Sequence, residues 1–528
     1  MDTNGNERPP AGPGRVHPFL DPGAPPSRLP DTEALLRDYV RRFNATDEEL
    51  YANAIPNADA EAWMLENVPR FACPDKDVER TWHFRWWTYR KHLRRGADGG
   101  WRVTEFLPSV PWAGADNTIV CAAGHHFLEG RWIRNPEYLA DNARFWLSSP
   151  AAGHRWKYSS WLFTGVRRFA EAHGLDDLPA RLLDDAVRYY RRWEEGFDGI
   201  SLWPAPGTGR MGGDGSGGFL SVDNFEGTEV SLGGSGWKPL MNSAMWSEAA
   251  GIAAVARRSG RAALAAEFEA KAEGVRRTLL EKCWNPETGF FSTRGYDGAL
   301  NPVRELHGYA PWYFGVPVGV APDWSQLSDP EGFAASRGLT FPERRAPGFS
   351  LSYEGHHCQW NGPSWPFATS VALTALANDL HRRPSEEGRR TFASLVRQYA
   401  AQHELVRERD GVRTAVPWID ENLNPDSPDW IARTMVRREG GIRERGKDYN
   451  HSTFCDLVVT GLCGFVPDGD GGFRVDPLAD PAWDWFVLEN LRWRGHDVSI
   501  RYLRGDGLSV SADGRRLTSR SGVFRAEA

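Results

Sequence analysis

Paired cysteines are missing from this 528-residue sequence. Its six cysteines are spread along the chain, and no two of them form a C-x-x-C pair; they are Cys73, Cys121, Cys283, Cys358, Cys455 and Cys463. Such spacing predicts neither a disulfide framework nor a zinc site. We therefore expect most of these thiols to be buried and free, and we expect no structural metal.

Long apolar runs are also missing. No stretch approaches the roughly 20 consecutive apolar residues that a membrane-spanning helix needs. Residues 2–30 are rich in Pro, Gly and polar side chains and lack the apolar segment of a secretory signal. A segment of this composition buries too little surface to order itself. We predict a flexible tail over residues 1–30, no membrane association, and a cytoplasmic protein.

Positive charge is not in surplus. The chain has 63 Lys and Arg against 70 Asp and Glu, which gives a formal net charge of −7. The arginines are scattered among acidic residues, so no basic stripe is available to neutralise a phosphate backbone. We expect no nucleic-acid partner.

Aromatic residues are abundant by contrast, with 24 Trp, 14 Tyr and 26 Phe. Many of the tryptophans stand in polar stretches rich in Gly and Pro, where core packing is the weaker explanation. Aromatic faces also stack on the apolar faces of sugar rings. The composition therefore favours a carbohydrate ligand, either a small molecule or an oligosaccharide.

A recurring unit organises the middle of the chain. Loops dense in aromatic, Gly, His and acidic residues run into helices of small and apolar residues at 111–130, 153–174, 242–260, 307–320, 356–379 and 448–464. Amphipathic segments with 3.6-residue periodicity separate most of them, at 135–147, 178–196, 262–283 and 385–403. This order predicts a mainly α protein, an (α/α)6 toroid of six helical hairpins with its functional loops at one end. The fourth unit lacks a recognisable outer helix, because residues 321–349 are rich in Pro and Gly.

The remaining segments are predicted to flank this ring. We expect a helical and aromatic segment over 31–105 packed on the barrel, the ring itself over 106–466, and a small β-rich subdomain over 467–528. Residues 498–517 alternate apolar and polar side chains around Gly-Asp-Gly and Ala-Asp-Gly turns, which is typical of a β-hairpin.

Two loops of the predicted ring each carry a pair of carboxylates. Glu226 and Glu229 lie in the Gly-rich loop 224–234, and Asp420 and Glu421 lie in the loop 417–430. Hydrolysis of a glycosidic bond with inversion requires a protonated carboxylic acid and a carboxylate that activates water, about 6.5–9.5 Å apart. These two loops offer such groups.

Three motifs carry a family resemblance. They are E-G-T-E-V-S at 226–231, Q-W-N-G-P-S-W-P at 359–366, and E-N-L-N-P at 421–425 with D-Y-N-H downstream at 448–451. Together they resemble the clan of (α/α)6 glycosidases that contains trehalases, mannosylglycerate hydrolases and processing α-glucosidases, which are glycoside hydrolase families 37 and 63. Order and spacing match over about residues 105–465.

The resemblance implies a role for each motif. Glu229 falls at the position of the general acid, where the clan usually has Asp, and Glu421 falls at the position of the base. Exo-acting, inverting hydrolysis of a terminal, α-linked glycosidic bond without a cofactor is then expected, with Glu226 and Asp420 as the fallback pair. The expected substrate-binding residues are Trp112, Asp116, Gln359, Trp360, Asn361, Trp365, Trp418, Asn450 and His451.

Several of these residues also fit plainer roles. Trp360 and Trp365 suit a hydrophobic core, and Asp116 suits an N-cap of the helix that follows it. The histidine pairs 125–126 and 356–357 lack zinc-type spacing, so hydrogen bonds to sugar hydroxyls or to the backbone are expected. Asp468 and Asp470 suit a turn better than a calcium site.

Three other functions stay open. A sugar epimerase or polysaccharide lyase with the same ring would depend on proton transfer by His or Tyr. A phosphorolytic relative would need a cation in a Gly-rich loop, and 212–218 has the glycines without one. The third alternative is a non-catalytic carbohydrate-binding protein. The sequence does not indicate the oligomeric state.

Overall fold

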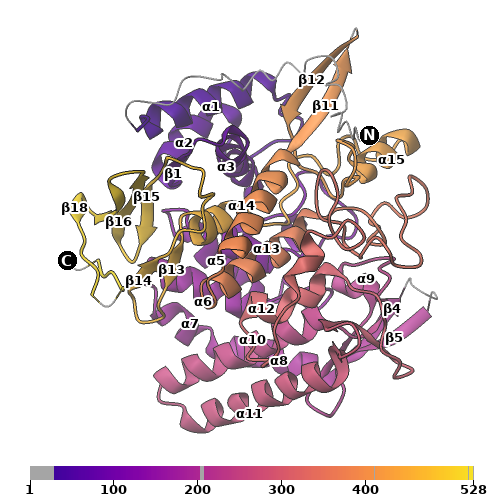
Figure 1. The fold of residues 1–528 in the computed structure, drawn as a ribbon. Coiled ribbons are helices and arrows are strands. Elements are labelled where there is room, and N and C mark those ends of the chain that lie inside the picture. Colours follow the sequence, from indigo (N-terminus) through magenta and orange to yellow (C-terminus); the bar gives the residue numbers. More distant parts are fainter. Residues whose placement is uncertain (1–28, 202–206, 410, 521, 527–528) are drawn as a thin grey trace, which may run out of the picture.

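The protein is described by a computed structural model, which covers residues 29–201, 207–409, 411–520 and 522–526. The tail predicted over 1–30 lies outside these residues, except for Leu29 and Pro30. Helices are more abundant than strands, and the strands near the C-terminus lie together at one side (Figure 1). In the described ranges, no helix is both long and apolar enough to span a membrane.

Six helices follow the six aromatic loops. They are α4 (Ala123–Gly130), α6 (Leu162–His173), α10 (Pro239–Arg258), α12 (Ala310–Phe314), α13 (Pro366–Leu380) and α16 (Cys455–Leu457), the last continued by a π-helical turn, η7 (Val458–Leu462). Each of them contacts the next, and α16 contacts α4, so their contacts form a closed circuit. In α13 all residues except Thr374 and Asn378 are buried. A helix that is apolar on all sides has to be surrounded by other elements, as α13 is here.

Amphipathic helices pack outside this circuit. They are α5 (Glu137–Ser148), α8 (Leu183–Glu195) with the short α7 (Asp177–Arg181) before it, α11 (Ala262–Thr278) and α14 (Glu386–Ala401), which coincide with the four segments expected from periodicity. In α8 the buried side chains include Leu183, Ala186, Val187 and Tyr190, which lie on one face. In the fourth unit the corresponding stretch holds only a 3-10 turn, η6 (Trp324–Leu327).

The Trp-rich N-terminal segment forms a helix of its own. This helix, α3 (Lys76–Tyr89), begins at the N-cap Asp75 and is buried from Val78 to Tyr89. It contacts both α14 and α16, so it covers the circuit of inner helices on that side. The other α-helices are α1 (Thr32–Thr46), α2 (Ala60–Asn67), α9 (Asp223–Glu226) and α15 (Ile431–Glu439).

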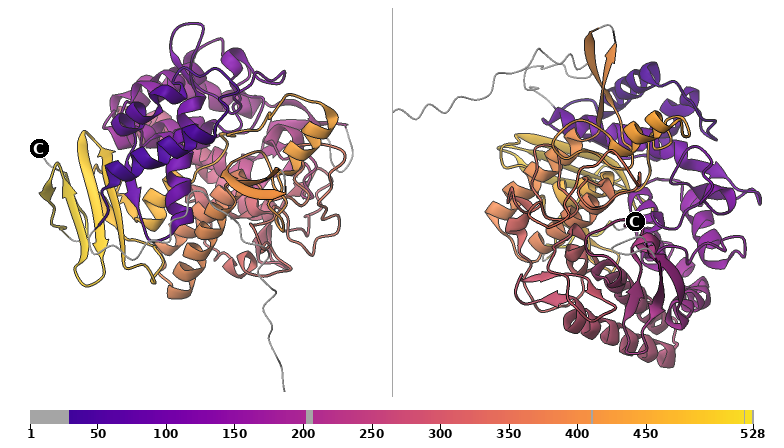
Figure 2. Two further views of the ribbon diagram at one scale, coloured as in Figure 1. Left: turned by 90° about the horizontal axis from the view of Figure 1, so that it is seen from above. Right: turned by 90° about the vertical axis from the view of Figure 1, so that its right-hand side faces the viewer.

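A five-stranded antiparallel sheet lies at the C-terminal end of the chain. Its order is β1 (Arg70–Ala72), β15 (Trp485–Trp493), β16 (His496–Leu503), β17 (Gly507–Ala512) and β18 (Arg515–Arg516). The hairpin expected over 498–517 corresponds to β16 and β17. The edge strand β1 comes from the N-terminal segment, with Phe71 opposite Leu488. The left view of Figure 2 shows these yellow strands beside the indigo N-terminal helices.

A second sheet, outside the sequence expectations, lies near the loop of Glu229. Its order is β10 (Arg294–Gly295), β7 (Gly236–Trp237), β6 (Phe219–Ser221), β5 (Gly207–Gly213) and β4 (Phe197–Ser201). The remaining strands pair in four hairpins: β2 (Leu93–Arg95) with β3 (Trp101–Val103), β8 (Trp284–Asn285) with β9 (Phe290–Phe291), β11 (Glu404–Arg409) with β12 (Val412–Pro417), and β13 (Phe465–Pro467) with β14 (Phe473–Val475). The β11–β12 hairpin projects from the body of the molecule (Figure 1).

One hydrophobic cluster runs through all of these parts. It includes Trp82 of α3, Leu376 of α13 and Ile500 of β16. Since the three segments predicted as separate regions share this core, both the N-terminal helices and the C-terminal sheet pack against the circuit of inner helices.

Candidate active site

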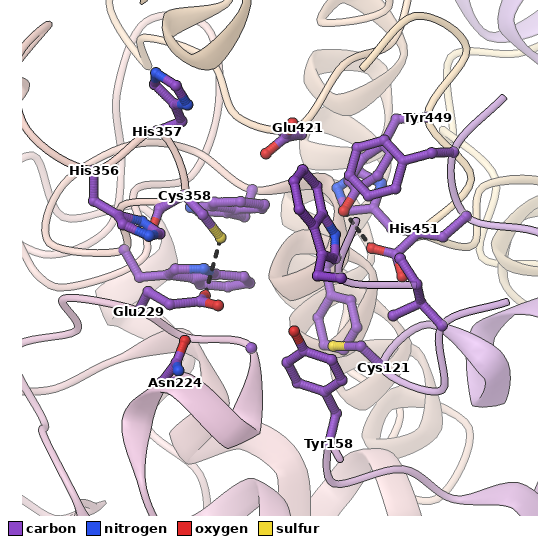
Figure 3. A pocket seen from close by; sticks show the side chains of 18 of the residues that line it. Cys121, Tyr158, Asn224, Glu229, His356, His357, Cys358, Glu421, Tyr449 and His451 are labelled. Atoms are coloured by element: carbon purple, nitrogen blue, oxygen red, sulfur yellow. Dashed lines mark hydrogen bonds between the residues drawn. The ribbon is translucent and has the colours of Figure 1, made fainter. Parts of the chain in front are cut away.

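The loops that lead into the inner helices surround a cavity of about 500 Å³. Glu229 and Glu421, which come from distant stretches of the chain, both line it. Figure 3 shows the two side chains in the same pocket. Its aromatic lining consists of Phe106, Trp112, Tyr158, Trp360, Trp365, Phe367 and Tyr449. A carbohydrate entering this cavity would therefore meet both carboxylates and several aromatic faces.

The loop after α9 positions Glu229. The helix ends at Gly227, whose φ of 74° is left-handed and whose Cβ, if present, would lie 2.6 Å from the Cys121 sulfur. Only glycine fits this turn without displacing its neighbour. Beyond it, the Glu229 carbonyl accepts a hydrogen bond of 3.0 Å from the Trp360 N–H. The loop is thus hydrogen-bonded to the motif at 359–366, which carries Trp360 and Trp365.

The Glu229 carboxyl group lies in a desolvated position. Its side chain is buried, and the Cys358 thiol donates a hydrogen bond of 3.0 Å to its Oε2 (Figure 3). Burial raises the pKa of Glu229 to about 7, and the thiol hydrogen bond opposes this shift. Since a general acid needs a pKa near the working pH, this environment suits proton donation near neutrality.

Glu421 lies in a different environment. Arg445 donates a hydrogen bond of 2.8 Å from Nε to Glu421 Oε1 and a second from Nη2. The guanidinium of Arg445 also lies over the Trp112 ring, 5.4 Å from its centroid. Charge-assisted hydrogen bonds of this kind are shorter and stronger than those between neutral groups. The cavity therefore places a desolvated carboxyl and an arginine-paired carboxylate around one space.

Two of the predicted substrate-binding residues, Trp360 and Trp365, form a parallel stack. The rings of Trp360 and Trp365 lie 4.0 Å apart with an interplanar angle of 5°, and both line the cavity. Trp360 also packs against His307 and Phe341, so it is a core residue as well as a wall of the site. Trp112 and His451 line the cavity too. The core interpretation of Trp360 is thus confirmed, and its stacking on a sugar stays a prediction.

Other predicted substrate-binding residues lie outside the lining. Asp116 accepts hydrogen bonds from Arg102 Nε at 3.1 Å and from the Ala97 N–H. Gln359 donates through Nε2 to the His356 carbonyl at 3.1 Å. Both side chains therefore stabilise loops around the cavity.

Trp418, Asn450 and Asn361 are also absent from the lining and form hydrogen bonds within the protein. Trp418 donates from Nε1 to Asp420 at 3.2 Å. Asn450 donates its side-chain amide to the Thr104 carbonyl at 3.3 Å. The backbone carbonyl of Asn361 accepts from the Ser350 N–H at 2.9 Å. In the residues described, none of the three faces the pocket.

The fallback carboxylates are engaged in the protein interior. Glu226 forms an ion pair of 2.8 Å with Lys238 and accepts a hydrogen bond of 3.1 Å from the Met241 N–H. Asp420 accepts a bond from the Glu421 N–H at 2.9 Å, and burial raises the pKa of Asp420 to about 7. Neither residue lines the 500 Å³ cavity.

Sequence reasoning missed a third acid in the cavity, Glu105. Its Oε1 accepts a hydrogen bond from the Tyr449 hydroxyl, and its Oε2 has no hydrogen-bond partner among the described residues. Burial raises the pKa of Glu105 to about 8, and the charge of Glu421 contributes. The sequence feature that could have pointed to Glu105 is its position a few residues before the first aromatic loop at 111–130. Other lining residues outside the predicted site residues include Cys121, Lys157, Tyr158, Cys358, Glu439, Arg445 and Tyr449.

The histidines and aspartates considered as possible metal ligands contact other protein groups. Within the described ranges, no group of three or more His, Cys, Asp or Glu side chains is arranged to hold a metal ion. His125 packs between Trp161 and Phe367, and His357 pairs with Glu439 at 2.6 Å. Asp468 accepts hydrogen bonds from the N–H groups of Asp470 and Gly472, as a turn residue does.

Comparison with known proteins supports this description of the fold. Residues 115–201 and 214–452, more than half of the chain, match the model of the mannosylglycerate hydrolase MGH1-like glycoside hydrolase domain. Among solved structures, one described as a sialidase is 30% identical with a TM-score of 0.80. That match covers 93% of this chain and 44% of the other, so this chain spans less than half of its length.

More distant similarities extend to two further glycosidases. A family 78 rhamnosidase from a Bacillus species is 14% identical with a TM-score of 0.49, covering 84% of this chain and 41% of that one. A family 63 mannosylglycerate hydrolase from Thermus thermophilus, solved with glucose, is 12% identical with a TM-score of 0.47, covering 72% and 99%.

The family match and the cavity together define a glycoside hydrolase domain. Within that class, the chain belongs to the MGH1-like family. The family resemblance that the three sequence motifs indicate is thereby confirmed.

Proposed function

We propose that this chain is an exo-acting, inverting glycoside hydrolase, with Glu229 as the general acid and Glu421 as the general base, acting on a terminal, α-linked sugar. One observation carries the proposal: two carboxylates in unlike environments line a single aromatic-walled cavity. The scaffold we propose for it is the (α/α)6 toroid. The closed circuit of contacts from α4 through α16 and back to α4 supports that scaffold.

In this mechanism the two glutamates divide the work. Glu229, protonated because it is buried, gives its proton to the glycosidic oxygen as the bond to the anomeric carbon breaks. Glu421 takes a proton from the water that attacks the opposite face of the sugar ring. Arg445 orients Glu421 before the reaction through two hydrogen bonds. The anomeric configuration is inverted in the product.

The cavity suits a small carbohydrate. Its volume of about 500 Å³ falls in the usual range for small-molecule sites, and three tryptophans in its lining are of a type suited to stacking on sugar rings. Turnover of a panel of aryl α-glycosides and natural disaccharides would identify the preferred sugar and aglycone. An aryl sialoside belongs in this panel, because the 30%-identical structure is described as a sialidase.

The assignment predicts the kinetics of three variants. Glu229→Gln and Glu421→Gln should each lower kcat by about 10³-fold or more, because each removes a proton-transferring group. Glu408→Gln, an exposed glutamate on β11, should keep wild-type kcat. Turnover is measured on the best substrate of the panel, with circular dichroism as the check on folding. Near-normal turnover in both active-site variants would contradict the proposal.

The pH profile and the product give two further tests. For the wild type, kcat/KM should fall as the pH rises through about 7, because Glu229 loses its proton there. NMR of the first-formed anomer should show inversion. A retained anomer would contradict the base role of Glu421.

A sugar epimerase or polysaccharide lyase is the second candidate. It is favoured by Tyr449 and His451, which line the same cavity and are groups suited to proton transfer at a sugar carbon. The product distinguishes the two reactions, since an isomerised or unsaturated sugar would replace the hydrolysed one.

A further inference from the structure

A short rim segment, residues 356–360, contacts both predicted catalytic loops. On one side the Trp360 N–H donates to the Glu229 carbonyl and the Cys358 thiol donates to Glu229 Oε2, both at 3.0 Å. Glu229 is therefore held at its backbone and at its carboxyl group by residues two positions apart. Among the described residues, Cys358 supplies the side-chain hydrogen bond to this carboxyl.

The other side of the segment is tied to the Glu421 loop. The Asn422 amide donates to the His357 carbonyl at 3.0 Å, and Arg445 Nη1 lies 3.4 Å from His357 Nδ1. Arg445 is also the partner of Glu421. The segment thus connects the environments of the two carboxylates, and Cys358 is its contact with the acid itself.

Taking Glu229 as the acid, which rests on the function proposed above, we propose that Cys358 is a positioning residue for it. By donating to Oε2, the thiol occupies one carboxyl oxygen and leaves Oε1 to carry the proton toward the glycosidic oxygen. Cys358 forms no covalent bond with the substrate in this scheme. Its role is to decide which oxygen of Glu229 delivers the proton.

The chemistry of the thiol fits this role. Burial raises the pKa of Cys358 well above its usual value, so the sulfur keeps its hydrogen and stays a donor instead of a nucleophile. A thiol is a weak donor compared with a hydroxyl. It can therefore orient the carboxyl group while leaving Glu229 protonated near neutrality, where a stronger donor would favour the anion.

Two variants at this position should shift the alkaline limb of the kcat/KM profile in opposite directions. Cys358→Ala removes the donor, so the limb should move to higher pH by up to about one unit, and kcat should fall several-fold because the acid is no longer oriented. Cys358→Ser supplies a stronger donor, so its limb should move to lower pH. A merely structural role for the thiol would not produce shifts of opposite sign.

The control is Cys463→Ala, which removes a buried thiol outside the cavity lining and should leave the limb in place. The substrate is the aryl glycoside or disaccharide that the wild type turns over best. If Glu229→Gln abolishes turnover and both Cys358 variants keep the wild-type limb, the positioning role is overturned while the proposed function stands. If Glu229→Gln keeps near-normal turnover, the proposed function itself fails.

An infrared measurement tests the same contact without a substrate. The S–H stretching band assigned by difference from Cys358→Ser should lie at lower frequency in the wild type than in Glu229→Gln, because an amide oxygen is a weaker acceptor than a carboxylate. The spectra are recorded above pH 8, where Glu229 is ionised. An unchanged band would overturn the proposal even if Cys358→Ala fails to fold.

Discussion

Four glutamates line one cavity, and the surroundings of three of them separate their chemistry. Glu229 has a thiol donor, Glu421 has an arginine, and Glu105 has a tyrosine hydroxyl. Burial without a cation raises the pKa of Glu229 and of Glu105. The same residue type can thus supply an acid, a base and a neutral hydrogen-bonding group within one site.

Glu105 should make the folded protein less stable at high pH. Its pKa is about 8 in the folded protein against about 4.3 in an unfolded chain, so the folded state binds the proton more tightly. The resulting stabilisation is lost as the pH rises from about 4 to 8. Since Gln cannot ionise, Glu105→Gln should gain thermal stability relative to the wild type between pH 5 and pH 9.

The measurement is the melting temperature of both proteins at each pH, with Glu408→Gln as the exposed control. For the control, the difference from the wild type should stay nearly constant with pH. A constant difference for Glu105→Gln as well would show that this carboxyl does not carry the shifted pKa.

At the scale of elements, close packing of the inner helices depends on small residues. A Cβ at Gly165 of α6 would lie 2.8 Å from Phe127 Cβ of α4, closer than such atoms approach in proteins. On the outer helix α11, a Cβ at Gly274 would meet Gly217 Cα at 3.6 Å, an ordinary contact. The two helical glycines therefore face very different neighbours.

Substitution by alanine should affect the two helices in opposite directions. Gly165→Ala should lower the free energy of unfolding by about 1–3 kcal/mol, because the helices have to move apart. Gly274→Ala should raise it by about 0.5–1 kcal/mol, because alanine favours the helix and meets no obstacle. Urea unfolding measures both. Equal effects at the two positions would contradict the packing argument.

Periodicity predicted the outer helices well and missed α3. The four amphipathic segments have apolar residues at helical spacing, and that pattern is visible without the fold. In α3 the residues from Val78 to Tyr89 are buried on every side, including charged ones such as Arg80 and Arg85. A helix enclosed in this way shows no polar face, so periodicity gave no bounds for it, although the segment that contains it was expected to pack on the barrel.

At the scale of the whole molecule, the C-terminal sheet is joined to the rest by strand pairing and by a shared core. The N-terminal strand β1 pairs with β15, and Ile500 of β16 belongs to the cluster that contains the inner helices. Parts that share a core are expected to unfold together.

A core substitution in the sheet should therefore destabilise the entire molecule. Ile500→Ala removes a fully buried side chain and should cost about 2–5 kcal/mol of unfolding free energy. Leu503→Ala, at a position 39% exposed, should cost far less. Urea unfolding is followed by Trp fluorescence and by the helical circular dichroism signal. If Ile500→Ala left the helical transition unchanged, the sheet would be an independent subdomain.

The sequence alone determined the features that are written locally: the loop-and-helix units, the amphipathic outer helices, the C-terminal hairpin and the motifs that identify the family. It also predicted Glu229 and Glu421, which reach one cavity and whose roles stay predictions. The tertiary structure decided the rest, namely that Glu105 and Cys358 join the site, that Asp116 and Asn450 are not part of its lining, and that β1 completes the C-terminal sheet. The reason is physical. Burial and contacts between distant residues set these positions and pKa values, and such contacts leave no periodic trace along the chain.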